Sequence, residues 1–415
     1  MEHVAFKRLP KKLNICFQLW LAFGGTPSSP YYDLDKVMIE MKERGFNCIR
    51  IESCAGLIHD IHGNLREPFY IDKKVKYGKF EPVMRQAGCL EGGVFVNLLD
   101  RVVKIFEMAK KHDMYIILSS WYYLHTYWLH EENSPLAKEL FDIPKHERIK
   151  SFAIFLHYII KELENRGLAD RIVVSEIFNE FNDLPFMNGF GGQWSATKED
   201  LVMFKKEHED SLEFLMKEHP DQLFAYDSGD PCHEDNRIPS NMQVYNFHAY
   251  FMWNLYNEVM DEHPEWQKGC YTAEDVANER KGRYPMSQDW YKRVAEYNNL
   301  DDNDMSMIEQ AIEDRFARDY DKYRNEMIKK LNRAIENANG VPIIFAEGVS
   351  YVASKKLLWE EKSNSYWKLI DEMMDAYKNA GLLGTIIRCN CGMEDPSWNV
   401  CPEKLIKANK RFLED

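Results

Sequence analysis

Two glutamates in the sequence stand at the ends of apolar segments, where they could act as a pair. Residues 172–180 end in Asn179-Glu180, and residues 342–347 end in Glu347. Two carboxyl groups about 5–5.5 Å apart can cleave a glycosidic bond with retention of configuration, one as acid and base and the other as nucleophile. Asn-Glu occurs at three other places, all in polar or helical context. Position therefore makes Glu180 and Glu347 the candidate catalytic pair.

Three more side chains near segment ends could support this pair. Arg50 lies near the end of the apolar segment 46–52, and an arginine beside the nucleophile would keep that carboxylate ionised. His248 and Tyr250 are two residues apart, so they point to the same face of an extended strand. We expect the tyrosine hydroxyl to bond the nucleophile, and the imidazole to tune the acid or hold substrate. The alternative is that these groups are structural ion pairs, or a buried histidine with a backbone partner.

Residues around the pair suggest further roles. The amide of Asn179 could hydrogen-bond a sugar hydroxyl. Glu176 precedes Glu180 by four residues on the same face of the strand but one layer deeper, so we expect a structural carboxylate bonded to Arg or His. Trp121 opens a segment dense in aromatic side chains. Such rings either pack within a loop or line a binding site, because flat apolar rings stack on sugar faces.

The elements that position these residues can be predicted from hydrophobic patterning. Eight apolar segments, each too short for a helix and rich in β-branched or aromatic residues, predict buried strands. They are 13–23, 46–52, 114–121, 172–180, 223–227, 244–250, 342–347 and 384–390. Amphipathic segments predict helices over 33–44, 95–112, 146–166, 199–218, 305–339 and 365–380. Eight such units indicate a parallel sheet closed into a (β/α)8 barrel, the TIM barrel, of the α/β class.

A doubly wound sheet is the structural alternative. It would carry a glycine-rich phosphate-binding turn after the first strand, and residues 24–29 do not match G-x-G-x-x-G. The chain exceeds the roughly 250 residues of a minimal barrel, and we expect the excess as long insertions in the βα loops 2, 3 and 6. The last of these begins with the aromatic segment 250–253. No linker or repeat marks a boundary, so residues 1–415 are predicted to form a single catalytic domain.

The composition excludes several classes of protein. The 415 residues include 53 basic and 67 acidic side chains, a net charge of −14, which argues against binding to nucleic acid or an anionic membrane. No apolar run approaches the ~20 residues of a transmembrane helix. Basic residues before 15–23 resemble the start of a signal peptide, but Gln18 interrupts the apolar run. We interpret this segment as the buried first strand and expect a cytoplasmic protein.

The cysteines and histidines do not form a recognisable metal motif. The nine cysteines are odd in number, which favours free thiols in a reducing compartment. Cys389-x-Cys391 and Cys401 lack the C-x2-C spacing and a nearby histidine. A metal-dependent barrel hydrolase is a rival that needs metal-binding clusters at strand ends, and the first strand offers no His-x-His. We therefore expect neither a metal nor an organic cofactor.

The order of these motifs resembles that of the clan A glycoside hydrolases, and most closely glycoside hydrolase family 5, the cellulase family. Four motifs carry the resemblance: Gly45-Phe46-Asn47-Cys-Ile-Arg50, Glu176-Ile-Phe-Asn179-Glu180, His248-Ala-Tyr250 and Phe345-Ala-Glu347-Gly348. The resemblance implies that Glu180 is the acid/base, Glu347 the nucleophile and Asn179 a ligand of the sugar 2-hydroxyl. It also implies a (β/α)8 barrel and a carbohydrate substrate.

The sequence departs from the family's usual pattern at three places. Phe181 replaces a proline, strand three ends in Trp121 without the usual histidine, and the last strand ends in 386–390 without the usual tryptophan. Trp121 could take over as the floor beneath the sugar at the cleaved bond. We therefore expect a retaining hydrolase of β-linked glycosides or oligosaccharides. The alternative is a catalytically inactive carbohydrate-binding protein of the same fold.

Overall fold

The eight predicted strands form one closed barrel at the centre of the molecule. The computed structural model describes residues 6–7, 9–18, 21–27, 29–71, 94–121, 139, 142–180, 197–233, 237–266, 300–349, 356–389, 392–393 and 395–414. The barrel order is β1-β10-β9-β8-β7-β6-β5-β2, with every neighbouring pair parallel. Its strands are β1 (Leu13–Phe17), β2 (Cys48–Glu52), β5 (Tyr115–Ser119), β6 (Ile172–Glu176), β7 (Phe224–Asp227), β8 (Val244–Tyr250), β9 (Ile343–Val349) and β10 (Gly384–Thr385). The predicted (β/α)8 barrel is confirmed.

Burial on both faces explains why these segments read as nearly continuous apolar runs. Every residue of β1, β2, β6 and β7 is buried, because helices cover the outside of the barrel and side chains fill its interior. Several predicted segments run past the strand itself. The segment 13–23, for example, ends in the 3-10 helix η2 (Leu21–Phe23). An apolar segment therefore indicates that the chain is buried there, but it does not indicate where the strand ends.

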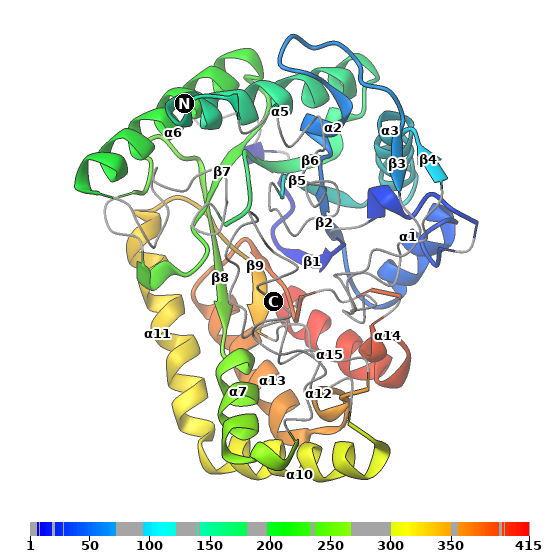
Figure 1. The fold of residues 1–415 in the computed structure, drawn as a ribbon, viewed down its shortest axis with the longest axis vertical. Helices are drawn as coiled ribbons and strands as arrows, with labels where there is room; N and C mark the ends of the chain where they lie inside the picture. Colours follow the sequence, from blue (N-terminus) through cyan, green and yellow to red (C-terminus); the bar gives the residue numbers. More distant parts are fainter. Residues whose placement is uncertain are drawn as a thin grey trace.

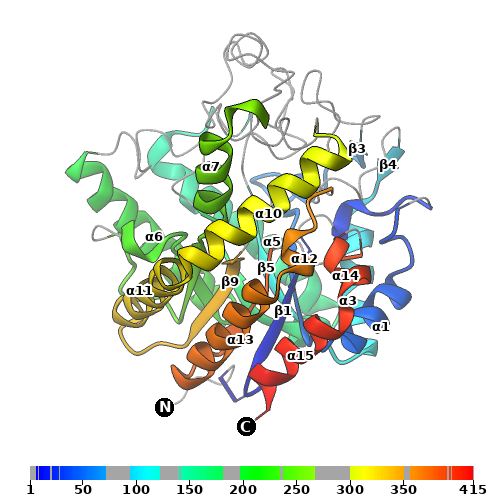
Figure 2. The same cartoon turned by 90° about the horizontal axis from the view of Figure 1, so that it is seen from below.

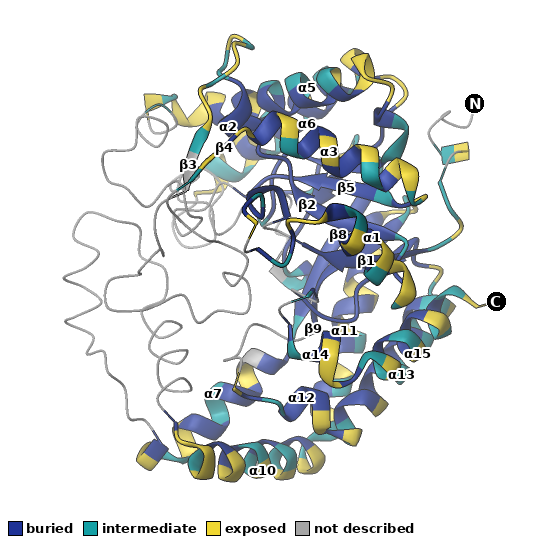
Figure 3. Cartoon of the chain, turned by 90° about the vertical axis from the view of Figure 1, so that its right-hand side faces the viewer, coloured by how far each residue is buried: buried dark blue, intermediate teal, exposed yellow. Residues whose placement is uncertain are grey.

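Helices surround the barrel and turn their buried faces toward it (Figures 1 and 3). The long ones are α1 (Leu34–Glu43), α3 (Leu98–Lys111), α5 (Arg148–Asn165), α6 (Lys198–Glu218), α10 (Asp302–Arg318), α11 (Tyr320–Ala338), α13 (Asn364–Asn379) and α15 (Pro402–Leu413). The shorter elements are α2 (Ala55–Ile58), α7 (Met252–Glu262), α12 (Trp359–Lys362), α14 (Pro396–Val400), β3 (Phe69–Ile71), β4 (Val94–Val96), η5 (Lys145–Glu147), η6 (Ala169–Arg171), η9 (Pro231–His233) and η10 (Pro264–Trp266).

Two predicted helices differ from those in the structure. The segment 95–112 begins as strand β4, and the helix starts only after Asn97, whose side chain accepts the backbone N–H of Asp100. The segment 305–339 forms two helices, α10 and α11, because the backbone of Asp319 leaves the helical conformation at φ −104° and ψ 19°. Both errors have one cause, since an amphipathic pattern can continue across a cap or a turn.

The connections between strands are uneven in length. Between β7 and β8, the described residues 228–233 and 237–243 contain only the short helix η9, so this unit lacks the covering α-helix of an ideal barrel. The loop after β2 carries α2 and the antiparallel β3–β4 pair, and the chain after β8 forms α7 and η10 before α10, which runs across the front of the molecule in Figure 2. Residues 72–93, 122–138 and 267–299 lie outside the described residues. No described helix is long and apolar enough to cross a lipid bilayer.

Candidate active site

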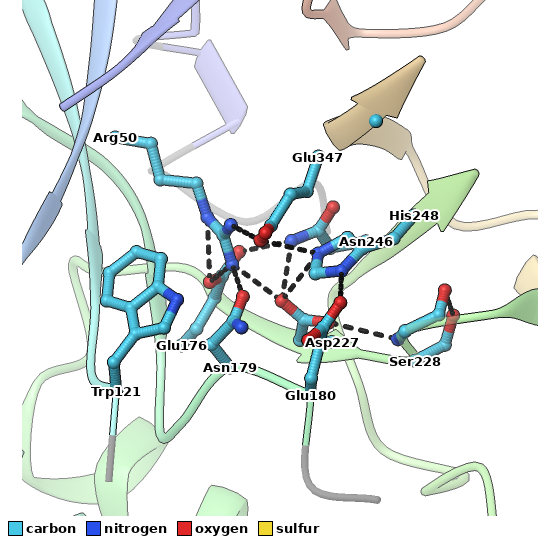
Figure 4. A network of polar contacts seen from close by, with 12 residues as sticks. Arg50, Trp121, Glu176, Asn179, Glu180, Asp227, Ser228, Asn246, His248 and Glu347 are labelled. Carbon is cyan, nitrogen blue, oxygen red and sulfur yellow. Dashed lines mark hydrogen bonds and ion pairs between the residues drawn. The ribbon is translucent and has the colours of Figure 1, made fainter. Parts of the chain in front are cut away.

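Arg50 lies at the centre of a buried polar network where the strands of the barrel end (Figure 4). Its guanidinium donates hydrogen bonds to four side chains: Glu176 at 2.6 and 3.2 Å, Asp227 at 2.6 Å, Asn179 at 2.6 Å and Glu347 at 2.9 Å. The arginine side chain has no exposed surface. It therefore acts on its protein neighbours, and Glu176 is the buried structural carboxylate that the sequence predicted.

A bulge in β9 directs Glu347 toward this network. The pairing of β9 with β8 shifts by one residue between Phe345 and Glu347, which leaves Ala346 as an extra residue in β9. Bulges of this kind re-aim the side chains that follow them. Phe345 packs outward on Tyr377 of α13, with 4.9 Å between ring centroids, whereas Glu347 reaches inward to Arg50. Without the bulge, residues two apart in a strand would share one face.

The environment of Glu347 changes its acidity. Burial raises its pKa to about 6. The positive charges of His248 and Arg50 and a hydrogen bond from Tyr250 limit this increase, whereas the nearby Glu180 adds to it. A carboxyl group with this pKa is mostly ionised at neutral pH, which is the form that a nucleophile requires.

Glu180 lies beyond β6 rather than in it, four residues after the last strand residue, Glu176. Its backbone adopts a φ of +44°, in the left-handed region that costs about 1–2 kcal/mol for a residue with a Cβ. Its carboxylate oxygen is 2.5 Å from Nδ1 of His248. The Glu180 side chain is 21% exposed and that of Glu347 10%, so both carboxyl groups keep some surface that a ligand could contact.

His248 faces carboxylates on two sides. Besides Glu180 at Nδ1, its Nε2 is 3.2 Å from Oδ2 of Asp227 and 3.6 Å from Glu347. Burial alone would lower the pKa of this imidazole, but the three carboxylates together raise it well above its usual value. One oxygen of Glu180, one of Glu347 and a ring nitrogen of His248 lie within 4.8 Å of one another, close enough to hold a cation. The raised pKa of His248 favours its protonated form, in which the ring nitrogens donate hydrogen bonds and do not bind a metal.

Tyr250 and Cys389 lie beside Glu347. The hydroxyl of Tyr250 is 3.2 Å from Sγ of Cys389, which also accepts the backbone N–H of Gly348 at 3.1 Å. Burial and nearby negative charge raise the pKa of Tyr250 well above its usual value. The phenol therefore stays neutral and can donate to Glu347.

The side chain of Trp121 is buried beside Arg50. Its ring centroid is 4.7 Å from the guanidinium carbon of Arg50 and 5.4 Å from the ring of Phe17, and the residue is 3% exposed. Its backbone N–H donates to Glu52 at 2.6 Å. The rest of the aromatic segment, 122–128, lies outside the described residues. In this structure, Trp121 covers Arg50, which donates a hydrogen bond to Glu347.

Three polar residues of the network were missed by the sequence interpretation. Asp227 is the last residue of the apolar segment 223–227, just as Glu347 is the last residue of 342–347. Its position at the end of a predicted strand could therefore have marked it as a site residue. Asn246 donates to Glu176 at 2.6 Å and to Asp227 at 3.1 Å. Glu52 is buried and accepts the N–H groups of Trp121 and Cys54, and burial raises its pKa to about 7. Their roles depend on partners from other strands, which a single segment does not reveal.

The fold and the site define the class of protein. Polar side chains gathered at the carboxyl ends of the strands of a closed (β/α)8 barrel form the usual active-site position of a barrel enzyme. A family model described as "Cellulase-like: Sugar-binding cellulase-like" matches residues 18–383. The chain belongs to this cellulase-like family, in agreement with the resemblance found in its motifs.

Three solved structures with a similar fold have glycoside hydrolase descriptions. A protein from Parabacteroides distasonis, provisionally assigned as a glycoside hydrolase, aligns over 97% of this chain and 93% of its own, with 18% identity and a TM-score of 0.57. A family 5, subfamily 4 broad-specificity endoglucanase from an uncultured bacterium aligns over 94% of this chain and 86% of its own, with 12% identity and a TM-score of 0.52. A tri-modular family 5 endo-β-1,4-glucanase from Bacillus licheniformis aligns over 98% and 61%, with 12% identity and a TM-score of 0.51. At these identities the likeness shows the fold. No curated protein matches the chain.

Proposed function

We propose that this protein is a retaining glycoside hydrolase that cleaves β-linked glycosides or oligosaccharides. One observation carries the proposal: carboxylate oxygens of Glu180 and Glu347 lie within 4.8 Å of each other. Retaining enzymes keep their two carboxyl groups about 5–5.5 Å apart, whereas inverting enzymes need roughly 6.5–9.5 Å to admit a water between them. The short separation supports the retaining mechanism.

In the first step, Glu347 attacks the anomeric carbon and Glu180 gives a proton to the leaving glycosidic oxygen. Arg50 and Tyr250 hold the attacking carboxylate in place through the hydrogen bonds described above. The amide oxygen of Asn179 accepts from Arg50, which orients its amide group for a sugar hydroxyl.

In the second step, Glu180 takes a proton from water, whose oxygen attacks the anomeric carbon and releases Glu347. The same pair of side chains thus serves both steps, and no organic cofactor is required.

The test is a screen of the purified protein on aryl β-glucoside, mannoside, galactoside and xyloside and on short β-gluco- and β-manno-oligosaccharides. Glu180→Ala and Glu347→Ala should each lower turnover by at least about 10³-fold, because each removes a group that the chemistry requires. Their melting temperatures should stay close to that of the unchanged protein. Unaltered turnover in either variant would refute the assignment of that residue.

Covalent labelling provides an independent check. A 2-deoxy-2-fluoro glycoside of the preferred sugar should accumulate on Glu347, which peptide mass spectrometry would locate. Labelling at another carboxylate would move the nucleophile elsewhere.

A carbohydrate-binding protein without turnover is the second candidate. The family description names sugar binding. Saturable thermal stabilisation by one of the sugars, with no hydrolysis of any, would favour this candidate over the enzyme.

A further inference from the structure

Strand β7 ends in a buried carboxylate, Asp227, that belongs to none of the motifs described above. The residue is 2% exposed. Its Oδ1 accepts the backbone N–H of Gly229 at 3.1 Å, and its Oδ2 accepts from Arg50 at 2.6 Å and from Asn246 at 3.1 Å. The same Oδ2 lies 3.2 Å from Nε2 of His248 and forms an ion pair with it, although the geometry is not that of a hydrogen bond. Asp227 therefore connects the arginine behind the nucleophile with the imidazole behind the acid.

Each ring nitrogen of His248 lies near a different carboxylate, as Figure 4 shows. Nδ1 is 2.5 Å from Oε1 of Glu180, and Nε2 faces Asp227. Because the proton carried by one ring nitrogen is set by the partner of the other, an ionised Asp227 favours a proton on Nε2. Nδ1 is then left to share a proton with Glu180. Three carboxyl groups lie around His248: Asp227 of β7, Glu180 after β6 and Glu347 of β9. Tyr250 lies beside it on the same strand. Arg50 of β2 contacts Asp227 and Glu347 and so acts on the imidazole through them.

We propose that Asp227 is a positioning residue that holds His248 in the Nε2–H form, so that the His248–Glu180 pair carries the proton taken by the glycosidic oxygen. This inference rests on the hydrolase activity proposed above. It assigns to the reaction a residue on a strand that the two catalytic glutamates do not use.

The protons and electrons balance in both steps. As the bond from the anomeric carbon to the glycosidic oxygen breaks and the bond to Glu347 forms, the proton shared by Nδ1 and Glu180 moves to the leaving oxygen. The pair is then a neutral imidazole, protonated at Nε2, beside the carboxylate of Glu180. When water attacks the anomeric carbon, its proton returns to the pair, and the bonding electrons return to Glu347.

The charge distribution agrees with this arrangement. Burial opposes the ionisation of Asp227, but the charges of His248 and Arg50 outweigh it and lower its pKa. Asp227 thus stays ionised, and together with Glu347 and Glu180 it raises the pKa of His248. Removing the charge of Asp227 should allow the pair to lose its proton at lower pH.

The experiment is a leaving-group series with Asp227→Asn. The substrates are phenyl, 4-nitrophenyl and 2,4-dinitrophenyl β-glycosides of the sugar that the unchanged protein hydrolyses. A dinitrophenolate needs little help from an acid, whereas a phenolate needs a proton. We expect kcat/KM to fall roughly 10- to 100-fold for the phenyl glycoside and much less for the dinitrophenyl glycoside. The basic limb of the pH profile should move to lower pH.

Glu176→Gln is the matched control. This substitution also removes one carboxylate charge next to Arg50, because Glu176 accepts from that arginine at 2.6 Å. The carboxylates that pair with His248 in the described residues are Glu180, Asp227 and Glu347, so the substitution leaves them in place. Its losses should be equal across the three leaving groups. Equal losses across the series in Asp227→Asn, with an unmoved basic limb, would reduce Asp227 to a structural role and overturn the proposal.

A measurement without substrate keeps the two proposals separable. In the unchanged protein labelled with ¹⁵N-histidine, and with His248→Gln used to assign the signal, the Nε2 of His248 should be protonated from acid to alkaline pH. A neutral tautomer protonated at Nδ1 would overturn the proposal, even where turnover is normal. Absence of turnover on every glycoside would instead refute the proposed hydrolase activity. The protonation state of Nε2 would then still test the effect of Asp227 on His248.

Discussion

At the scale of single residues, the site is an arrangement of buried charge in which acids outnumber bases. Two positive side chains, Arg50 and His248, face four carboxyl groups: Glu176, Glu180, Asp227 and Glu347. Like charges held this close in a buried site cannot all ionise freely. Burial and a neighbouring carboxylate both raise the pKa of Glu347 and of Glu176. The pKa of Asp227 is lowered instead, because His248 and Arg50 are close to it.

The raised pKa of Glu347 predicts the acidic limb of the pH profile. As the proposed nucleophile, Glu347 must be ionised, and a pKa of about 6 means that its reactive form is lost as the pH falls through that value. We expect kcat/KM on an aryl glycoside to decline below about pH 6, with the apparent pKa belonging to the coupled site. Tyr250→Phe removes a hydrogen bond that lowers this pKa, so it should move the limb to higher pH. A limb near 4.5, the ordinary value for a glutamate, would contradict the prediction.

At the scale of elements, the register of two neighbouring strands decides which way the side chain of Glu347 points. The bulge at Ala346 is followed by Gly348, which has a φ of +143° and pairs with Ala249 of β8. A Cβ on Gly348 would lie 2.2 Å from the carbonyl oxygen of Ala249. Backbone atoms cannot move aside as a flexible side chain does, so only glycine permits this close approach.

Gly348→Ala should therefore disturb both stability and activity. The forced separation of β8 and β9, together with the strained φ, should cost about 2–4 kcal/mol of unfolding free energy. It should also displace Glu347 and lower kcat by at least about tenfold. Urea denaturation and turnover on an aryl glycoside would measure the two effects.

Gly340→Ala is the control for backbone strain alone. Gly340 has a φ of +88°, and nothing lies within 4 Å of the position of its Cβ. It should cost about 1 kcal/mol and leave kcat unchanged. Equal effects of the two substitutions would show that the contact with Ala249 is unimportant.

At the scale of the whole molecule, the two ends of the chain close the barrel at the face opposite the site. Asn14 near the start of β1 donates to the carbonyl oxygens of Gly45 at 3.0 Å and of Asn409 in α15 at 2.8 Å. Asn409 in turn donates to the carbonyl oxygen of Arg44 at 2.7 Å. Polar residues at the amino ends of barrel strands serve stability rather than chemistry, and these bonds join segments almost 400 residues apart.

Asn14→Ala should lower stability without affecting the reaction. Loss of the amide leaves two carbonyl groups without this donor, at a cost of about 1–3 kcal/mol. The melting temperature should fall while kcat and the pH profile stay as they are. Asn325→Ala, on an exposed position of α11, should change the unfolding free energy by no more than about 0.5 kcal/mol. A change in the pH profile of Asn14→Ala would contradict this separation of the two faces.

Much of the fold was predictable because burial leaves a local trace in the sequence. All eight strands were placed by apolar segments, and the long helices except α15 by amphipathic periodicity. The errors fell at boundaries such as Asn97 and Asp319, where a cap or a turn interrupts the chain but not its hydrophobic pattern. The predicted insertions lie largely outside the described residues, so their form stays a prediction.

The sequence by itself determined that two glutamates end buried segments and that an arginine, a histidine and a tyrosine lie near other segment ends. Residue type and strand position carry that information locally. The tertiary structure alone decided that Ala346 bulges to turn Glu347 inward, that Trp121 covers Arg50, and that Asp227 faces His248. These features arise from contacts between strands far apart in the sequence. Their energies depend on which side chains meet across the closed barrel, and no single segment specifies that.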